Sequence, residues 1–254
     1  MRIQPSALSV QLLSSRAELG RTAGRDIADA IRKAIADQGT ARVVFAAAPS
    51  QSETLESLQA ASDIDWSRVD AFHMDEYVGL ATGAPERFAL WLRRNLFDRL
   101  PFRSVQLIDP GADPDREAAR YAELLAQGPI DVVVLGIGVN GHVAFNDPPV
   151  ADFADPLLVK VVELDEDCRR QQVDDDCFTR IEDVPTRAVT LTVPALLSGR
   201  RLFCVVPGAS KAAAVRATLA EPVSTAWPST ALRQHPDCTL YLEPASASRL
   251  EASR

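Results

Sequence analysis

The feature that most limits the fold of this chain is a series of short β-branched and aromatic runs that alternate with segments of helical spacing. Most of these runs are apolar at consecutive positions, so both of their faces should be buried. Such strands are typical of a parallel sheet covered by helices. The predicted strands are residues 42–45, 69–72, 131–135, 189–193 and 202–206.

Helical signals lie between the predicted strands. Residues 17–36 carry apolar side chains at helical spacing, and Asp113 and Pro114 place a capping residue and a first-turn proline before 116–126. This order predicts an α/β fold with a doubly wound, mostly parallel sheet and helices on both faces. Because the 254 residues contain no repeat and no linker-like stretch, we expect a single domain over 1–254.

Charge and composition narrow the class of partner and the compartment. The net charge of -8 opposes binding to nucleic acid or to an anionic membrane surface, although a few local cations can still hold an anionic small molecule. No apolar stretch is long enough to span a membrane, and the N-terminus carries no targeting signal. The four cysteines lack the spacing of paired metal ligands, so we predict a cytoplasmic protein with free thiols.

An acidic pair follows one predicted strand at the edge of the sheet where ligands usually bind. Asp75 and Glu76 should emerge there in a partly desolvated setting, which raises the pKa of a carboxyl and suits it to proton abstraction. An arbitrary Asp-Glu pair is more often a solvated loop that caps the next helix. The pair alone therefore does not decide the function.

A glycine-rich loop follows another predicted strand. Residues 136–141, GIGVNG, match the GxGxxG pattern of dinucleotide-binding proteins. That pattern requires a helix after its last glycine, whereas Pro148 and Pro149 interrupt any helix that follows Gly141. We therefore predict a loop in which Gly138 and Gly141 let a ligand approach the backbone.

The same loop ends in a titratable side chain. His142 has a reference pKa of about 6.5 and can exchange a proton near neutral pH. Asp147 can orient the imidazole or act itself as an acid or base, but an Asp before prolines is equally an ordinary turn residue. A histidine beside a glycine loop at a strand end is better placed for chemistry than most single histidines.

Two further strand ends offer groups that suit an anion. Lys211 lies in the first turn of a predicted helix over 212–219, where its ammonium and the free N–H groups can point the same way. Ser50, Gln51 and Ser52 lie between a strand and a helix and can bind phosphate oxygens. Taken singly, the lysine can be an ordinary surface residue and the three polar residues can be helix caps.

Two ordered segments carry a resemblance to a known family. Residues 72–80, FHMDEYVGL, and 136–148, GIGVNGHVAFNDP, closely resemble the signature segments of glucosamine-6-phosphate deaminases, which are related to 6-phosphogluconolactonases. Weaker similarity extends through 184–197, 208–213 and 232–235. The resemblance implies a Rossmann-like fold and conversion of an amino-sugar 6-phosphate to fructose 6-phosphate and ammonia. It implies a small sugar phosphate as substrate and no metal or nucleotide cofactor.

The resemblance also implies roles for individual residues. His142, assisted by Asn140 and Asp147, would open the sugar ring, and Asp75 would then move a proton between C2 and C1 of the open chain. Glu76 would support the site, and Lys211 would bind the phosphate. The predicted catalytic residues are Asp75, Asn140, His142 and Asp147, and the predicted substrate-binding residues are Glu76, Gly138, Gly141, Ser50, Gln51, Ser52 and Lys211.

The sequence departs from the family at several of these positions. Many members carry Asp where Asn140 stands and Glu where Asp147 stands; an Asn can hold the imidazole by a hydrogen bond but does not stabilise its cation by charge. Residues 46–52 lack the glycines of the family's phosphate loop, and 173–178 hold no counterpart to its phosphate-binding Arg. The longer tail of allosterically regulated members is also missing, so we predict no activator site.

These departures keep other functions open. The alternatives are a galactosamine-6-phosphate deaminase, a 6-phosphogluconolactonase-type hydrolase in which His142 activates water, and a non-catalytic sugar-phosphate sensor. Assembly into a homo-oligomer also remains open.

Overall fold

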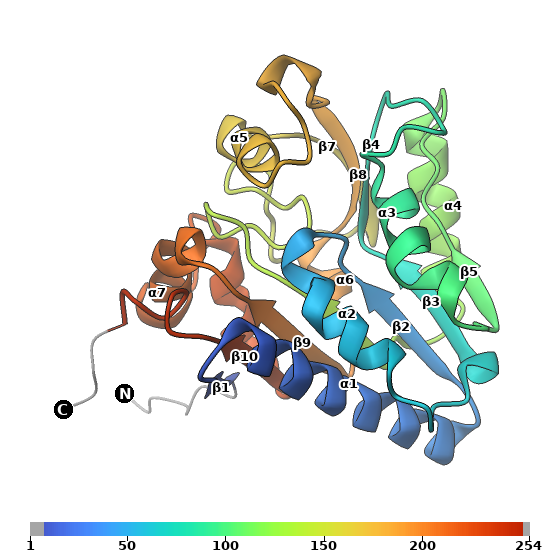
Figure 1. Cartoon of the computed structure of the whole chain (residues 1–254). Helices are drawn as coiled ribbons and strands as arrows, with labels where there is room; N and C mark the ends of the chain where they lie inside the picture. Colours follow the sequence, from blue (N-terminus) through green and yellow to red (C-terminus); the bar gives the residue numbers. More distant parts are fainter. Residues whose placement is uncertain (1–7, 251–254) are drawn as a thin grey trace.

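The computed structural model describes residues 8–250 and is built around a seven-stranded sheet (Figure 1). Every neighbouring pair of strands in this sheet is parallel. After β5 the chain crosses to the far side of β2, so β2 and β6 flank the point where the direction of winding reverses. In spatial order the strands are β1 (Leu8–Leu12), β10 (Cys238–Leu242), β9 (Arg201–Val206), β6 (Val132–Leu135), β2 (Ala41–Phe45), β3 (Val69–His73) and β5 (Ser104–Gln106).

Helices cover both faces of this sheet, as the sequence predicts. Alternate residues of a strand point to opposite faces, and in β2 Val43 and Phe45 join one hydrophobic core while Val44 joins the other. The first core is closed by α1 (Arg16–Gln38), α2 (Ser52–Gln59) and α3 (Phe88–Asn95). The second is closed by α4 (Pro114–Ala126), α6 (Val193–Leu197) and α7 (Ala212–Ala220).

The predicted start of α4 is confirmed in detail. The side chain of Asp113 accepts a hydrogen bond from the Arg116 N–H at 3.0 Å, and Pro114 is the first helical residue. The Asp113 side chain satisfies one of the N–H groups that an α-helix leaves free at its start, and Pro114 has no N–H to satisfy. The helix expected over 17–36 is likewise present as α1, which extends to Gln38 and ends at Gly39 in the left-handed conformation.

A second sheet corrects one prediction. Residues 189–193 were expected to form a strand of the parallel sheet, but β8 (Arg187–Leu191) lies between β4 (Asp75–Tyr77) and β7 (Val159–Glu163) in an antiparallel, three-stranded sheet. Val193 instead begins α6, because the Thr192 side chain caps that helix and Pro194 lies in its first turn. This small sheet and α5 (Glu166–Asp174) lie beyond the carboxyl ends of the central strands of the large sheet (Figure 1).

Short 3-10 helices fill several of the remaining connections. No helix within residues 8–250 is long and apolar enough to cross a lipid bilayer. The predicted domain 1–254 and the predicted absence of an N-terminal signal reach into residues outside the described range. The 3-10 helices are Pro49–Gln51, Trp66–Arg68, Phe97–Arg99, Ile181–Asp183, Ala209–Lys211 and Pro228–Gln234.

Candidate active site

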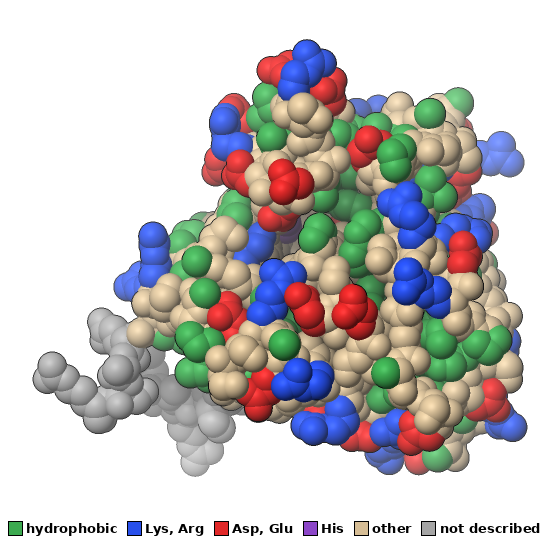
Figure 2. Space-filling view, viewed as in Figure 1, with side chains coloured by type: hydrophobic (Ala, Val, Ile, Leu, Met, Phe, Trp, Pro, Cys, Tyr) green, Lys and Arg blue, Asp and Glu red, His purple; other side chains and the backbone are tan. Residues whose placement is uncertain are grey.

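A cavity lies at the carboxyl ends of the central strands, where the winding of the sheet reverses. Its floor is formed by residues 46–51 after β2, by residues that follow β3, and by 136–138 after β6. Residues of α5 and its C-terminus close it from the opposite side. The molecular surface is hollowed in this region, and hydrophobic side chains show within the hollow (Figure 2). This is the edge at which the sequence predicts ligand binding.

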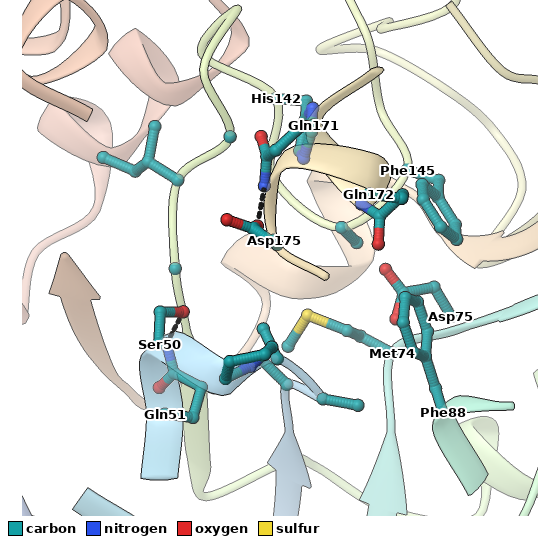
Figure 3. A pocket seen from close by; sticks show the side chains of 18 of the residues that line it. Ser50, Gln51, Met74, Asp75, Phe88, His142, Phe145, Gln171, Gln172 and Asp175 are labelled. Carbon is teal, nitrogen blue, oxygen red and sulfur yellow. Dashed lines mark hydrogen bonds between the residues drawn. The ribbon is translucent and has the colours of Figure 1, made fainter. Parts of the chain in front are cut away.

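Asp75 projects into this cavity (Figure 3). It is the first residue of β4, opposite Thr190 of β8, and only 6% of its surface is exposed. Burial raises the pKa of the Asp75 carboxyl well above its usual value, and the negative charge of the neighbouring Glu76 raises it further. A carboxyl whose pKa is shifted upward is a stronger base than an exposed one when it is ionised, which suits it to general acid–base chemistry.

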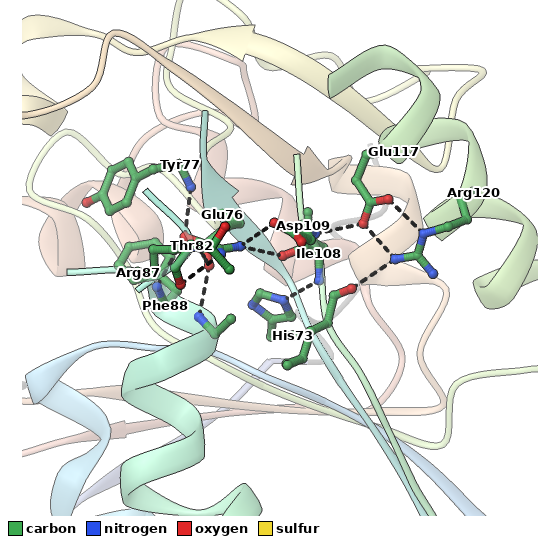
Figure 4. Close-up of polar contacts among 12 residues, drawn as sticks. His73, Glu76, Tyr77, Thr82, Arg87, Phe88, Ile108, Asp109, Glu117 and Arg120 are labelled. Carbon is green, nitrogen blue, oxygen red and sulfur yellow. Dashed lines mark hydrogen bonds and ion pairs between the residues drawn. The ribbon is translucent and has the colours of Figure 1, made fainter. Parts of the chain in front are cut away.

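Glu76 points away from the cavity, which corrects its predicted role in substrate binding. Alternate residues of a strand face opposite sides, so Asp75 and Glu76 cannot both face the cavity from β4. The fully buried Glu76 carboxylate accepts hydrogen bonds from the N–H groups of Tyr77, Phe88 and Ala89 at 3.0–3.1 Å (Figure 4). Its Oε2 lies 3.5 Å from Nε of Arg87. Glu76 therefore fixes β4 against the start of α3.

The Glu76 contacts predict the effect of a conservative change. Glu76→Gln keeps the shape of the side chain but replaces one of its two acceptor oxygens by an NH2 group, which cannot accept from the N–H groups or from Arg87. We expect the free energy of unfolding to fall by about 2 kcal/mol, the usual cost of a buried donor left without an acceptor, with little change in substrate KM. Urea unfolding and steady-state kinetics measure the two effects. A raised KM with unchanged stability would place Glu76 in the substrate site after all.

His142, Asp147 and Asn140 form a connected group on the other wall of the cavity. Nδ1 of His142 lies 2.9 Å from Oδ1 of Asp147. The Asn140 amide donates to the same Asp147 oxygen at 3.0 Å, and its own oxygen accepts the backbone N–H of His142 at 3.0 Å. Asn140 therefore holds the loop and the Asp147 carboxylate, whereas the sequence analysis expected it to hold the imidazole itself. Asp147, although shorter than Glu, reaches the imidazole.

The Asp147 carboxylate is set up to remain ionised. Burial alone would raise the pKa of Asp147, but the contacts with His142 and Asn140 and the N–H of Asp165 outweigh burial and hold this pKa below its usual range. A carboxylate beside Nδ1 favours the tautomer that carries its proton there and leaves Nε2 free to accept one. Nε2 is therefore the imidazole nitrogen that remains free for a substrate.

The hydrogen bonds of the glycine loop hold the backbone around His142 and are not directed at the cavity. The N–H of Gly138 donates to the His142 carbonyl at 2.9 Å, and the N–H of Gly141 donates to the Gly138 carbonyl at 3.0 Å. Gly138 lines the cavity, whereas Gly141 faces Trp227, whose ring is 2.8 Å from the position of a Cβ on Gly141. Neither N–H points at a substrate, which corrects that part of the prediction. No helix follows Gly141 before β7 within the described chain, as expected.

The cavity also contains the predicted anion-binding groups. Lys211 lines it and is 5% exposed, and its Nζ has no hydrogen-bond partner among residues 8–250. Burial lowers the pKa of Lys211, although the negative charge of Asp175 counteracts this. Ser50 and Gln51 also line the cavity, and the Gln51 amide donates to Ser50 Oγ at 3.2 Å. Ser52 begins α2 outside the cavity lining and acts there as a helix residue.

Several cavity residues escaped the sequence analysis. Phe88 and Phe145 form apolar walls, and Gln171, Gln172 and Asp175 reach in from α5 and its C-terminus (Figure 3). Two signals pointed to this segment: the acidic run 174–176, which the sequence marks as a loop, and the alignment of 173–178 with the region of the family's phosphate-binding Arg. Nothing in the sequence says that α5 lies over the carboxyl ends of the strands.

One group of side chains has the composition of a metal site. Ligand atoms of His142, Asp147 and Cys168 lie within 4.8 Å of one another. However, burial raises the pKa of the Cys168 thiol well above its usual value, and the negative charge of Asp147 raises it further. The thiol is therefore protonated at neutral pH, whereas a metal requires the thiolate. The group fits hydrogen bonding better than metal binding.

The fold and this cavity define an α/β enzyme with a carboxyl group and a carboxylate-supported imidazole facing one ligand site. Comparisons with known proteins agree. A glucosamine-6-phosphate deaminase of Enterococcus faecalis is 34% identical over 213 residues, which cover 83% of this chain and 88% of the relative. The solved structure of a monomeric glucosamine-6-phosphate deaminase superposes with a TM-score of 0.86 at 28% identity, covering 94% of this chain and 99% of that one.

Lactonases share this fold. A 6-phosphogluconolactonase from Thermotoga maritima superposes with a TM-score of 0.76 at 18% identity, over 93% of this chain and 99% of its own. Residues 14–241 match the family model of glucosamine-6-phosphate isomerases/6-phosphogluconolactonase. The chain belongs to this family.

Proposed function

We propose that this protein isomerises and deaminates a hexosamine 6-phosphate, converting glucosamine 6-phosphate and water to fructose 6-phosphate and ammonia. The observation that carries this proposal is the placement of Asp75 and His142 on one cavity from two different strand ends. The names of the relatives supply the substrate, since the E. faecalis protein and the monomeric structure are both glucosamine-6-phosphate deaminases.

The first step requires a group that moves a proton at the ring oxygen. His142 faces the cavity, and the ionised Asp147 beside its Nδ1 stabilises the imidazolium that forms when Nε2 takes a proton. The imidazole takes the proton of the C1 hydroxyl and then gives it to the ring oxygen, so the C1–O5 bond breaks and an aldehyde forms at C1. The aldehyde then delocalises the charge that develops when C2 loses its proton.

The second step requires a base that returns the proton it removes. Asp75, in its carboxylate form, takes the proton from C2 and delivers it to C1, while O1 gains the proton that the amine nitrogen gives up, so C1 becomes an alcohol and C2 an imine. Water adds to the imine carbon, the C2–N bond breaks, and ammonia leaves with both protons of that water, whose oxygen remains as the C2 carbonyl. The raised pKa of Asp75 makes its carboxylate a stronger base toward the C2 proton than an exposed carboxylate would be.

A panel assay tests this proposal. Purified protein is incubated with the 6-phosphates of glucosamine, galactosamine and mannosamine, and ammonia and ketose phosphate are measured together. We expect both products in equal amounts from at least one hexosamine, with glucosamine 6-phosphate preferred. Hydrolysis of 6-phosphogluconolactone without ammonia release would instead indicate a lactonase, and calorimetric binding of all three sugars without turnover would indicate a sensor.

We also propose that the protein works in the cytoplasm on a soluble small molecule. Its four cysteines are all free, which supports a reducing compartment. Fractionation of cells that express the native protein, with antibody detection, tests this assignment.

A further inference from the structure

The end of the cavity at Lys211 contains a buried cation without a partner. Lys211 is 5% exposed, and none of the hydrogen bonds or ion pairs among residues 8–250 involves its Nζ. An ammonium that is buried without a partner is unfavourable unless a ligand supplies one. This end of the cavity is therefore built to receive an oxygen-bearing group.

The same end also contains a carboxylate that a phosphate site would avoid. Asp175, at the C-terminus of α5, lines the cavity together with Lys211 and is held there by the Gln171 amide, which donates to its Oδ2 at 3.1 Å (Figure 3). Asp175 is near enough to act on the charge of Lys211 but forms no ion pair with it in the described part of the chain. Its charge therefore remains available to a ligand.

The remaining groups at this end are neutral. Lys211 is the one lysine or arginine among the described residues that line the cavity. The turn after β2 contributes Ser50 and Gln51, and Pro49 removes an N–H that another residue could have offered to an anion. Oε1 of Gln51 is buried and has no donor among residues 8–250. The formal charges of Lys211 and Asp175 cancel.

We infer that Asp175 is a specificity residue that weakens the hold of this site on a phosphate, so that the enzyme also accepts hexosamines whose far end is a hydroxyl. This inference rests on the proposed deaminase function and concerns the non-reacting end of the same substrate. A phosphate dianion would bring two negative charges next to the Asp175 carboxylate and leave this end with a net negative charge. A neutral sugar would leave it balanced.

A hydroxyl matches the groups that are present better than a phosphate does. The Lys211 ammonium donates, whereas the Asp175 carboxylate and Gln51 Oε1 can only accept. A hydroxyl both donates and accepts, so it can satisfy one group of each kind. A fully ionised phosphate offers acceptors alone. It would leave Gln51 Oε1 without a donor and would give the Asp175 carboxylate no donor besides the Gln171 amide.

The decisive variant is Asp175→Asn, with Asp176→Asn as its control. Asn retains an oxygen that can accept from Gln171, so the local fold should persist. Asp176 carries the same charge one residue later, is exposed and does not line the cavity; its backbone is left-handed, a conformation that Asn tolerates well. The control therefore removes one charge from the surface and none from the cavity.

We expect Asp175→Asn to raise kcat/KM for glucosamine 6-phosphate by roughly tenfold, because it removes one nearby like charge from a partly buried site. For unphosphorylated glucosamine kcat/KM should stay level or fall, and Asp176→Asn should change neither value appreciably. Equal effects of Asp175→Asn on both sugars, or no effect on either, would overturn the inference.

A binding measurement separates this inference from the proposed function. Isothermal titration calorimetry of inorganic phosphate against the wild type and both variants needs no turnover. Tighter phosphate binding by Asp175→Asn alone supports the specificity role even if no hexosamine is deaminated, in which case the proposed function fails by itself. Unchanged phosphate affinity together with normal deaminase activity would reject the role of Asp175 and leave the function standing.

Discussion

Asp75→Asn is expected to lower kcat for ammonia release by about 10³- to 10⁴-fold and to leave KM nearly unchanged. A positioned acid or base contributes up to about 10⁴-fold to a proton transfer, and an amide oxygen does not take the C2 proton at neutral pH. KM should remain nearly unchanged because Asn has nearly the same shape as Asp, and because Asp75 does not neutralise the charge of the substrate. A coupled ammonia assay measures kcat, and loss of C2 proton exchange in D₂O identifies the failed step.

Protein stability provides the control for this variant. The pKa of Asp75 is raised in the native state, so above the unfolded pKa of about 3.9 the native state binds more protons than the unfolded state. The Asp75 carboxyl therefore costs more stability as the pH rises from that value to the native pKa, and a constant amount above it. Asn does not titrate. We expect the Tm of Asp75→Asn to exceed that of the wild type at pH 7, by a margin that grows from pH 4 upward; a lower Tm would point to misfolding as the cause of inactivity.

The large sheet could be predicted from the sequence because its strands are buried on both faces. Four of the five predicted strands lie in it, including the stretches that became β2, β3, β6 and β9. The fifth, 189–193, failed because an antiparallel strand buried on both faces has the same sequence pattern as a parallel one. Its partner β4 has three residues, too few to show any period. Hydrophobic periodicity therefore could not reveal the second sheet.

The site could be predicted in its residues but not in their orientation. Asp75 and Glu76 are adjacent acids on one short strand, and a shift of one residue in register would exchange which of them faces the cavity. The sequence does not contain this register, because it is set by the pairing of β4 with β8. In the same way, the family resemblance indicates His142 and Asp147, whereas the contact between Asn140 and the His142 backbone depends on how the loop turns.

The least predictable part of the site is the end of the cavity at Lys211, where we expect the non-reacting end of the substrate to bind. Lys211 and Ser50 follow strands of the large sheet, so the rule that ligands bind at strand ends finds them. Gln171 and Asp175 come from a helix that covers this edge from outside the sheet. Their positions depend on tertiary packing of α5, which no local pattern encodes. Substrate specificity is therefore harder to predict from this sequence than the reaction.

Gly138→Ala is expected to lower kcat by about 10²- to 10³-fold, through displacement of His142. An ideal Cβ on Gly138 would lie 2.1–2.3 Å from Cε1, Nε2 and Nδ1 of the imidazole, far inside van der Waals contact. The ring would have to swing away from Asp147, whose Oδ1 now lies 2.9 Å from Nδ1, and a displacement of about 1 Å in a catalytic group can cost on the order of 10²-fold. Gly138 does not adopt a positive φ, so the alanine strains the contact and not the backbone.

Gly83→Ala is the matched control, because an added Cβ there meets no atom within 4 Å and the φ of Gly83 is also ordinary. Its kcat should equal that of the wild type. Far-UV circular dichroism then distinguishes displacement of the imidazole from simple loss of fold. A lowered kcat in a folded Gly138→Ala protein indicates displacement. Wild-type kcat in Gly138→Ala would mean that the imidazole is free to move during the reaction, and that its contact with Asp147 is not required for ring opening.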